Sequence, residues 1–158
     1  MHLFHLFAHQ AAERLPGTWA AQPRSYDRRL DQSMDTGRIW TPWDDRPGLA
    51  PRLRAALLLG ADGLLLYLVE HRQDRALVCP VVPLDLHEDI TDHLPAPPSV
   101  AVPLDPVRAA WRITDRVLPH YTAAVADARE AAAYLAARRA HSPAPLPAPL
   151  PSPPARSR

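Results

Sequence analysis

Proline constrains this chain more than any other residue type, with 20 prolines among 158 residues. They are densest near the C-terminus, where proline alternates with small or aliphatic residues from Pro143 to Pro153. Each proline ring fixes φ and removes a backbone donor, which excludes both a continuous helix and a central strand. We therefore predict one folded domain over residues 1–140, followed by an extended, disordered proline-rich tail over residues 141–158.

The charged residues exclude several chemistries. All 18 basic residues are arginine, so no lysine can form a Schiff base or bind phosphate in a P-loop. The net charge of +1 is too small to indicate a dedicated nucleic-acid binder. A single cysteine, Cys79, excludes an intramolecular disulfide, and its apolar neighbours predict a small buried side chain. Residues 1–9 lack the pattern of a signal peptide and no apolar run is long enough to span a membrane, so we expect a cytoplasmic protein.

The clearest strand signal lies in the middle of the chain. Apolar runs at residues 55–59 and 64–69 flank Gly60-Ala61-Asp62-Gly63, which is typical of a β-hairpin. The runs are almost continuously apolar, so we expect strands that are buried on both faces. Leucine also favours helix, and a helix over residues 52–59 is the alternative. Further strands are predicted over residues 18–22, 28–33, 38–40, 76–82 and 99–104, with a loop over residues 41–51.

Helices are predicted at the two ends of the domain. Apolar residues recur at helical spacing over residues 3–15, before Pro16-Gly17 ends the pattern. Asp105-Pro106 supplies an N-cap and a first-turn proline for a helix to Leu118, whose inward stripe would include Val107 and Trp111. A second helix follows to Ala140. The fold class is therefore α+β: an N-terminal helix, a mostly antiparallel meander and two C-terminal helices packed on one face.

Two histidine-containing segments are candidate metal sites. His2, His5 and His9 would share one face of the first helix, although we expect a solvated polar face there in preference to a metal site. In residues 85–93, His87, Asp89 and His93 could ligate a metal ion or support a small metal-dependent hydrolase. No established metal motif is present there, and an acidic, solvated helical turn is the alternative. We therefore expect no cofactor.

Arginine and tryptophan residues are the candidate binding groups. Arg108, Arg112 and Arg116 are spaced by four residues and would line one edge of a helix, where they could dock an acidic partner or phosphates. Trp40 and Trp43 lie beside a proline and would form a recognition patch if they were exposed; otherwise they would fold back on the core.

Parts of the chain resemble small uncharacterised proteins of high-GC actinobacteria. The similarity lies in Leu15-Pro16-Gly17-Thr18-Trp19, the central hairpin, the run Asp105-Pro106-Val107-Arg108-Ala109-Ala110 and Leu118-Pro119-His120-Tyr121. The resemblance implies one α+β domain closed by C-terminal helices, and it implies no catalytic residues.

The sequence therefore favours a non-enzymatic interaction module. We expect it to bind an unknown protein partner through the tryptophans, the arginine edge or the proline-rich tail. A metal-binding protein and a nucleic-acid binder that uses surface arginines are the alternatives. The sequence leaves the oligomeric state open.

Overall fold

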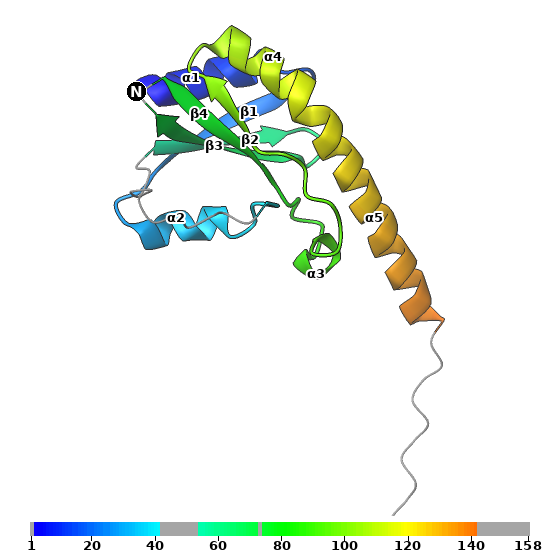
Figure 1. The fold of residues 1–158 in the computed structure, drawn as a ribbon. Helices are drawn as coiled ribbons and strands as arrows, with labels where there is room; N and C mark the ends of the chain where they lie inside the picture. Colours follow the sequence, from blue (N-terminus) through cyan, green and yellow to red (C-terminus); the bar gives the residue numbers. More distant parts are fainter. Residues whose placement is uncertain (1, 42–53, 73, 142–158) are drawn as a thin grey trace, which may run out of the picture.

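A five-stranded antiparallel sheet forms the centre of the protein, in the order β1-β2-β3-β4-β5 (Figure 1). The computed structural model describes residues 2–41, 54–72 and 74–141. The strands are β1 Trp19–Ser25, β2 Arg54–Gly60, β3 Leu65–Arg72, β4 Arg75–Val81 and β5 Val100–Pro103. The helices are α1 Leu3–Ala12, α2 Arg29–Thr36, α3 Glu88–Thr91, α4 Pro106–Arg116 and α5 Leu118–Ala140. The predicted α+β class is confirmed, whereas the predicted tail from residue 142 lies outside the described residues.

The central hairpin joins β2 to β3 as the sequence predicts, and the alternative of a helix over residues 52–59 is wrong. Leu59 pairs with Leu65, and the Gly60 amide donates to the Leu64 carbonyl at 2.8 Å. Gly63 has a φ of 76°, which an L side chain rarely adopts. A Cβ atom at Gly60 would lie 3.2 Å from the Trp19 ring, so a side chain there would force the ring to shift by a few tenths of an ångström.

Both faces of the sheet are buried, in agreement with the continuous apolar runs. Leu58, Leu66 and Leu68 belong to the larger core cluster, which includes the buried residues of α1, α4 and α5. Tyr67 and Val69 alternate with them and belong to a second cluster on the opposite face. This alternation follows from the two-residue period of a strand. Figure 1 shows α1 and α4 on one side of the sheet and α2 on the other.

The sequence predicts strands at residues 28–33 and 38–40, but neither range forms a strand of the sheet. Residues 29–36 form the helix α2, and the later segment makes only an isolated bridge between Ile39 and Val81. Gln32 attaches α2 to the sheet, because its buried side chain donates a hydrogen bond to the Tyr67 hydroxyl of β3 at 3.0 Å. A tertiary hydrogen bond therefore overrides a weak local preference for strand.

The start of α4 follows the predicted capping pattern. The Asp105 side chain accepts a hydrogen bond from the Arg108 amide at 2.7 Å, and Pro106 occupies the first turn of α4. Pro119 stands in the first turn of α5, where it begins a new helix because no amide donor is needed there.

Tyr121 attaches α5 to the middle of the sheet. Its fully buried hydroxyl donates to the Val81 carbonyl at 2.7 Å and accepts from the Leu65 amide at 2.9 Å. The Trp40 ring meets the Tyr121 ring edge-on at 6.4 Å between centroids. Burial raises the pKa of Tyr121 to about 12, so the hydroxyl stays protonated and can donate at neutral pH.

We predict that Tyr121→Phe lowers the free energy of unfolding by about 1–3 kcal/mol, because it leaves a carbonyl and an amide of the sheet without their partner. Urea denaturation followed by circular dichroism would measure the change. Tyr134→Phe is the matched control, since Tyr134 is 62% exposed and should tolerate the loss of its hydroxyl. Equal stabilities of the two variants would contradict the role given to Tyr121.

Candidate interaction surface

The outer face of α4 exposes large apolar side chains. Val107 is 61% exposed and Trp111 is 62% exposed, one helical turn apart. Their exposure corrects the prediction that both belong to the inward stripe. The buried side of α4 consists instead of Ala109, Ala110 and Ile113, which are close to one another around the helix axis. Because Ala109 and Ala110 are small, they let α4 approach the sheet closely, and Trp111 lies on the solvent side.

The predicted arginine edge lies beside this apolar stripe. Arg108 and Arg116 are exposed, and Arg112 is half-buried with its guanidinium 3.4 Å from the Ala101 carbonyl of β5. Arg116 lies 3.9 Å from Asp115. Within the described part of the chain, Arg108 and Arg112 form no ion pair with a carboxylate. Two positive charges next to Val107 and Trp111 therefore remain available to a ligand.

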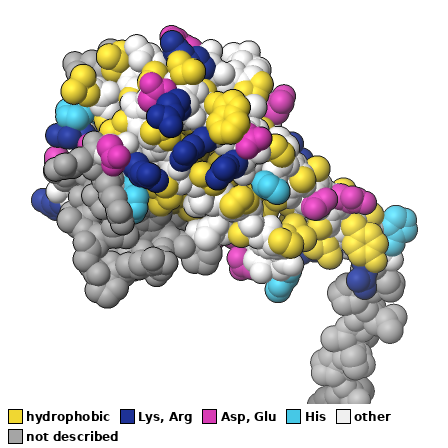
Figure 2. All heavy atoms as spheres, turned by 45° about the horizontal axis from the view of Figure 1, so that its top comes forward, with side chains coloured by type: hydrophobic (Ala, Val, Ile, Leu, Met, Phe, Trp, Pro, Cys, Tyr) yellow, Lys and Arg dark blue, Asp and Glu magenta, His cyan; other side chains and the backbone are white. Residues whose placement is uncertain are grey.

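Figure 2 shows the same arrangement on the surface. The face at the top of Figure 1 is turned forward there, and dark blue basic side chains gather around yellow apolar ones. We use the name α4 face for Val107, Arg108, Trp111 and Arg112. It combines exposed apolar area with uncompensated positive charge, which is typical of a recognition surface.

The predicted aromatic patch at residues 40–43 does not form through Trp40. Trp40 is only 7% exposed and belongs to the larger core cluster, where it packs on Tyr121. The alternative, in which the side chain folds back on the core, is the one observed for Trp40. Trp43 lies outside the described residues. Trp111 is thus the tryptophan that the described structure exposes most plainly.

The candidate metal ligands in residues 85–93 do not assemble. Nδ1 of His87 lies 3.2 Å from an Asp89 carboxylate oxygen, and both side chains are at least 75% exposed. His87 is the N-cap of α3, whereas His93 lies beyond the C-cap of that helix. Across the described ranges, no three histidine, cysteine, aspartate or glutamate side chains are grouped closely enough to hold a metal ion. The structure therefore does not bring His87, Asp89 and His93 together as a three-ligand group.

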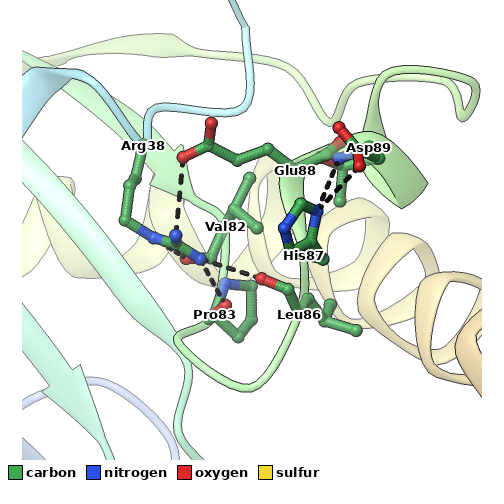
Figure 3. Close-up of polar contacts among 8 residues, drawn as sticks. Arg38, Val82, Pro83, Leu86, His87, Glu88 and Asp89 are labelled. Atoms are coloured by element: carbon green, nitrogen blue, oxygen red, sulfur yellow. Dashed lines mark hydrogen bonds and ion pairs between the residues drawn. The ribbon is translucent and has the colours of Figure 1, made fainter.

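The 82–88 segment has a structural role that Figure 3 makes plain. Arg38 reaches into it and donates to the carbonyls of Pro83 at 2.9 Å, Leu86 at 3.0 Å and Val82 at 3.4 Å. Its guanidinium also lies 3.4 Å from Glu88. One arginine therefore satisfies the backbone acceptors of a loop that leaves β4, and the ionisable residues of the loop surround this contact.

The N-terminal histidines also have separate local roles. His2 accepts a hydrogen bond from the Phe4 amide at 3.2 Å and so caps α1. Nε2 of His5 lies 3.2 Å from the Arg24 carbonyl of β1. These contacts direct the two rings to different backbone groups, and His9 does not join them in a metal-binding group.

Sequence reasoning missed a shallow depression between the hairpin turn and α5. It has a volume of about 510 Å³, and its lining includes Trp19, Gly60, Thr114 and Thr122. A neighbouring hollow of about 410 Å³ extends it towards Arg129. Its walls come from four segments far apart in the chain, so no local pattern could have revealed it.

Several polar groups of this depression are already engaged. Trp19 donates its indole N–H to the Pro16 carbonyl at 2.9 Å, and Thr122 donates to the Leu118 carbonyl at 2.8 Å. Arg129 pairs with Asp85 at 3.0 Å, and this hydrogen bond lowers the pKa of the Asp85 carboxyl. The depression therefore offers a ligand no free acid–base pair.

The chain has no match among known protein families, curated proteins or solved structures. In the part of the chain that the structure describes, no helix combines the length and the apolar character needed to cross a membrane.

We predict that Arg38→Ala lowers the free energy of unfolding by about 1–3 kcal/mol, because several buried or half-buried carbonyls lose a charged donor. Chemical denaturation would measure the loss. Arg139→Ala is the control, because Arg139 is an exposed residue near the end of α5. A loss for Arg38→Ala no larger than that of the control would contradict the assigned role.

Cys79 should be unreactive in the native protein. Its side chain is 2% exposed, and burial raises the pKa of the thiol to about 11. Since only the thiolate attacks disulfide reagents, we expect labelling near neutral pH to require unfolding. Colour development with Ellman's reagent, with and without denaturant, would check this. Rapid labelling without denaturant would show that Cys79 is accessible.

Proposed function

We propose that this protein is a non-enzymatic interaction module whose α4 face binds an acidic segment of a partner protein. The observation that carries the proposal is the exposure of Trp111 and Val107 next to Arg108 and Arg112. Tryptophan and arginine are the residues that most often dominate the binding energy of protein interfaces. The ligand we expect presents an apolar side chain flanked by aspartate or glutamate.

The apolar part of the α4 face supplies affinity. Trp111 is 62% exposed, and covering the rest of the indole would contribute on the order of 3–4 kcal/mol before the costs of association. Val107 extends the same stripe by one turn. The backbone beneath them is rigid, because α4 is capped by Asp105 and fixed to the core by Ile113. A rigid, preformed surface loses little entropy when it binds.

The arginines supply specificity for acidic groups. Arg112 is held at β5 by its contact with the Ala101 carbonyl, so its position is set before a ligand arrives. Arg108 begins one turn away, and its guanidinium forms no ion pair among the described residues. Carboxylates of a partner would pair with both, whereas a basic partner would be repelled.

Protein binding is favoured over nucleic-acid binding by the size and composition of this surface. The α4 face offers two uncompensated arginines and a hydrophobic centre, and the whole chain has a net charge of only +1. Nucleic-acid sites usually need a larger basic area, because their affinity depends on many phosphate contacts.

Site-specific photo-crosslinking in the native host tests the proposal. A benzophenone amino acid at Val107 should give a discrete crosslinked protein, and mass spectrometry should map the contact to an acid-rich segment. The same group at Leu30 is the matched control, because Leu30 is 74% exposed but lies on α2. A crosslink to nucleic acid, a contact segment without acidic residues, or no specific product at Val107 would contradict the proposal.

Trp111→Ala should weaken binding of the mapped segment about 10–100-fold, as expected for an anchor residue. Arg108→Glu combined with Arg112→Glu should also weaken it and should reverse its dependence on salt concentration, because salt then screens a repulsion instead of an attraction. Titration of the synthetic segment, followed by fluorescence anisotropy, measures both effects. Leu30→Ala should bind like the wild type, and a similar affinity for Trp111→Ala would exclude the α4 face as the binding site.

A further inference from the structure

A separate surface lies on α5, where the helix continues beyond the domain. Residues after Ala128 are no longer buried, although the helix runs on to Ala140 (Figure 1). The projecting part exposes Tyr134 by 62% and Leu135 by 39%. Apolar side chains on an unpacked helix are costly in water, and short helices without packing are marginally stable. Ala132 still packs partly against the core, but Tyr134 and Leu135 are not among the side chains that pack against it within the described chain.

One face of the projecting helix has a regular pattern. Asp127, Ala131, Tyr134 and Arg138 are separated by four, three and four residues. This is the spacing of core positions in a two-stranded coiled coil, and it puts the four side chains on one side of the helix. We call these four residues the α5 seam. It differs from the side that packs on the domain, which contains Tyr121, Val125 and Ala128.

The charges of the α5 seam are separated along the helix. The acidic Asp127 stands at the end nearest the domain, and the basic Arg138 stands near the C-terminal end. Both side chains are exposed, and neither pairs with an opposite charge within the described residues. A ligand for this face must therefore place a basic group beside Asp127 and an acidic group beside Arg138.

We propose that the α5 seam binds a second copy of this chain, so that two α5 helices pack antiparallel about a two-fold axis between residues 132 and 133. In this register Asp127 of each chain faces Arg138 of the other, twice by symmetry. Ala131 faces Tyr134 in the same way, so a small side chain makes room for a large one. A parallel arrangement would instead bring equal charges together, and the seam is self-complementary only in the antiparallel one.

The size of the seam sets the expected strength of the dimer. From Asp127 to Arg138 the helix rises about 16 Å at 1.5 Å per residue. Such an interface is small compared with those of permanent dimers, so we expect reversible association that depends on concentration. The proposal uses no residue of the α4 face and stands or falls independently of it.

Sedimentation equilibrium of the full chain tests the proposal. We expect a monomer–dimer equilibrium over an accessible concentration range. Asp127→Arg and Arg138→Asp should each weaken dimerisation about tenfold or more, because each brings like charges together in both symmetric contacts. Arg139→Asp is the matched control: it makes the same change one residue along, about 100° away around the helix, and should leave the equilibrium nearly unchanged.

Mixing the two variants provides the decisive measurement. A chain with Asp127→Arg carries two basic residues in the seam, and a chain with Arg138→Asp carries two acidic ones. An equimolar mixture should therefore form a heterodimer at least as readily as the wild type forms its homodimer. The double variant within one chain should also recover dimerisation. A chain that stays monomeric, or a dimer that responds to neither variant or is not restored by mixing, would overturn the proposal.

Discussion

The contact between Tyr121 and the sheet is the interaction on which the remaining arrangement depends. Its hydroxyl satisfies the Leu65 amide of β3 and the Val81 carbonyl of β4, and its ring supports Trp40. Since Tyr121 lies in the first turns of α5, the contact fixes where that helix begins. The same contact joins the start of α5 to the sheet close to the end of α4, whose own buried residues include Ile113. Both proposed binding surfaces therefore depend on one buried phenol.

The two surfaces use different chemistry because they lie on different parts of a continuous helical unit. The α4 face is backed by the sheet, and its arginines stand beside an exposed indole on a rigid support. The α5 seam projects from the domain, and its charges are arranged with opposite signs at its two ends. A rigid patch with one sign of charge suits a different molecule of opposite sign, whereas a stripe with both signs suits its own copy.

The ionisable residues that first drew attention in the sequence have structural roles. Glu88 pairs with the same Arg38 that satisfies the Pro83 and Leu86 carbonyls, and His2 caps a helix. The spacing of these histidines and carboxylates suggested metal ligands because it shows which residues are near each other along the chain. It does not show where their side chains point. The contact between Arg38 and residues 82–88 joins segments more than 40 residues apart, so local patterns contain no signal for it.

By itself, the sequence determined the features that depend on local backbone chemistry. Glycines and an aspartate specified the turn of the hairpin, Asp105-Pro106 specified the start of α4, and the continuous apolar runs specified strands with two buried faces. Tertiary structure decided the features that depend on competition between distant segments. Residues 29–36 form a helix that is attached to the sheet by the hydrogen bond from Gln32 to Tyr67. Trp111 is exposed because the alanines of α4 fit more closely against the sheet. A periodic pattern can identify a helix, but only packing selects which of its faces is buried.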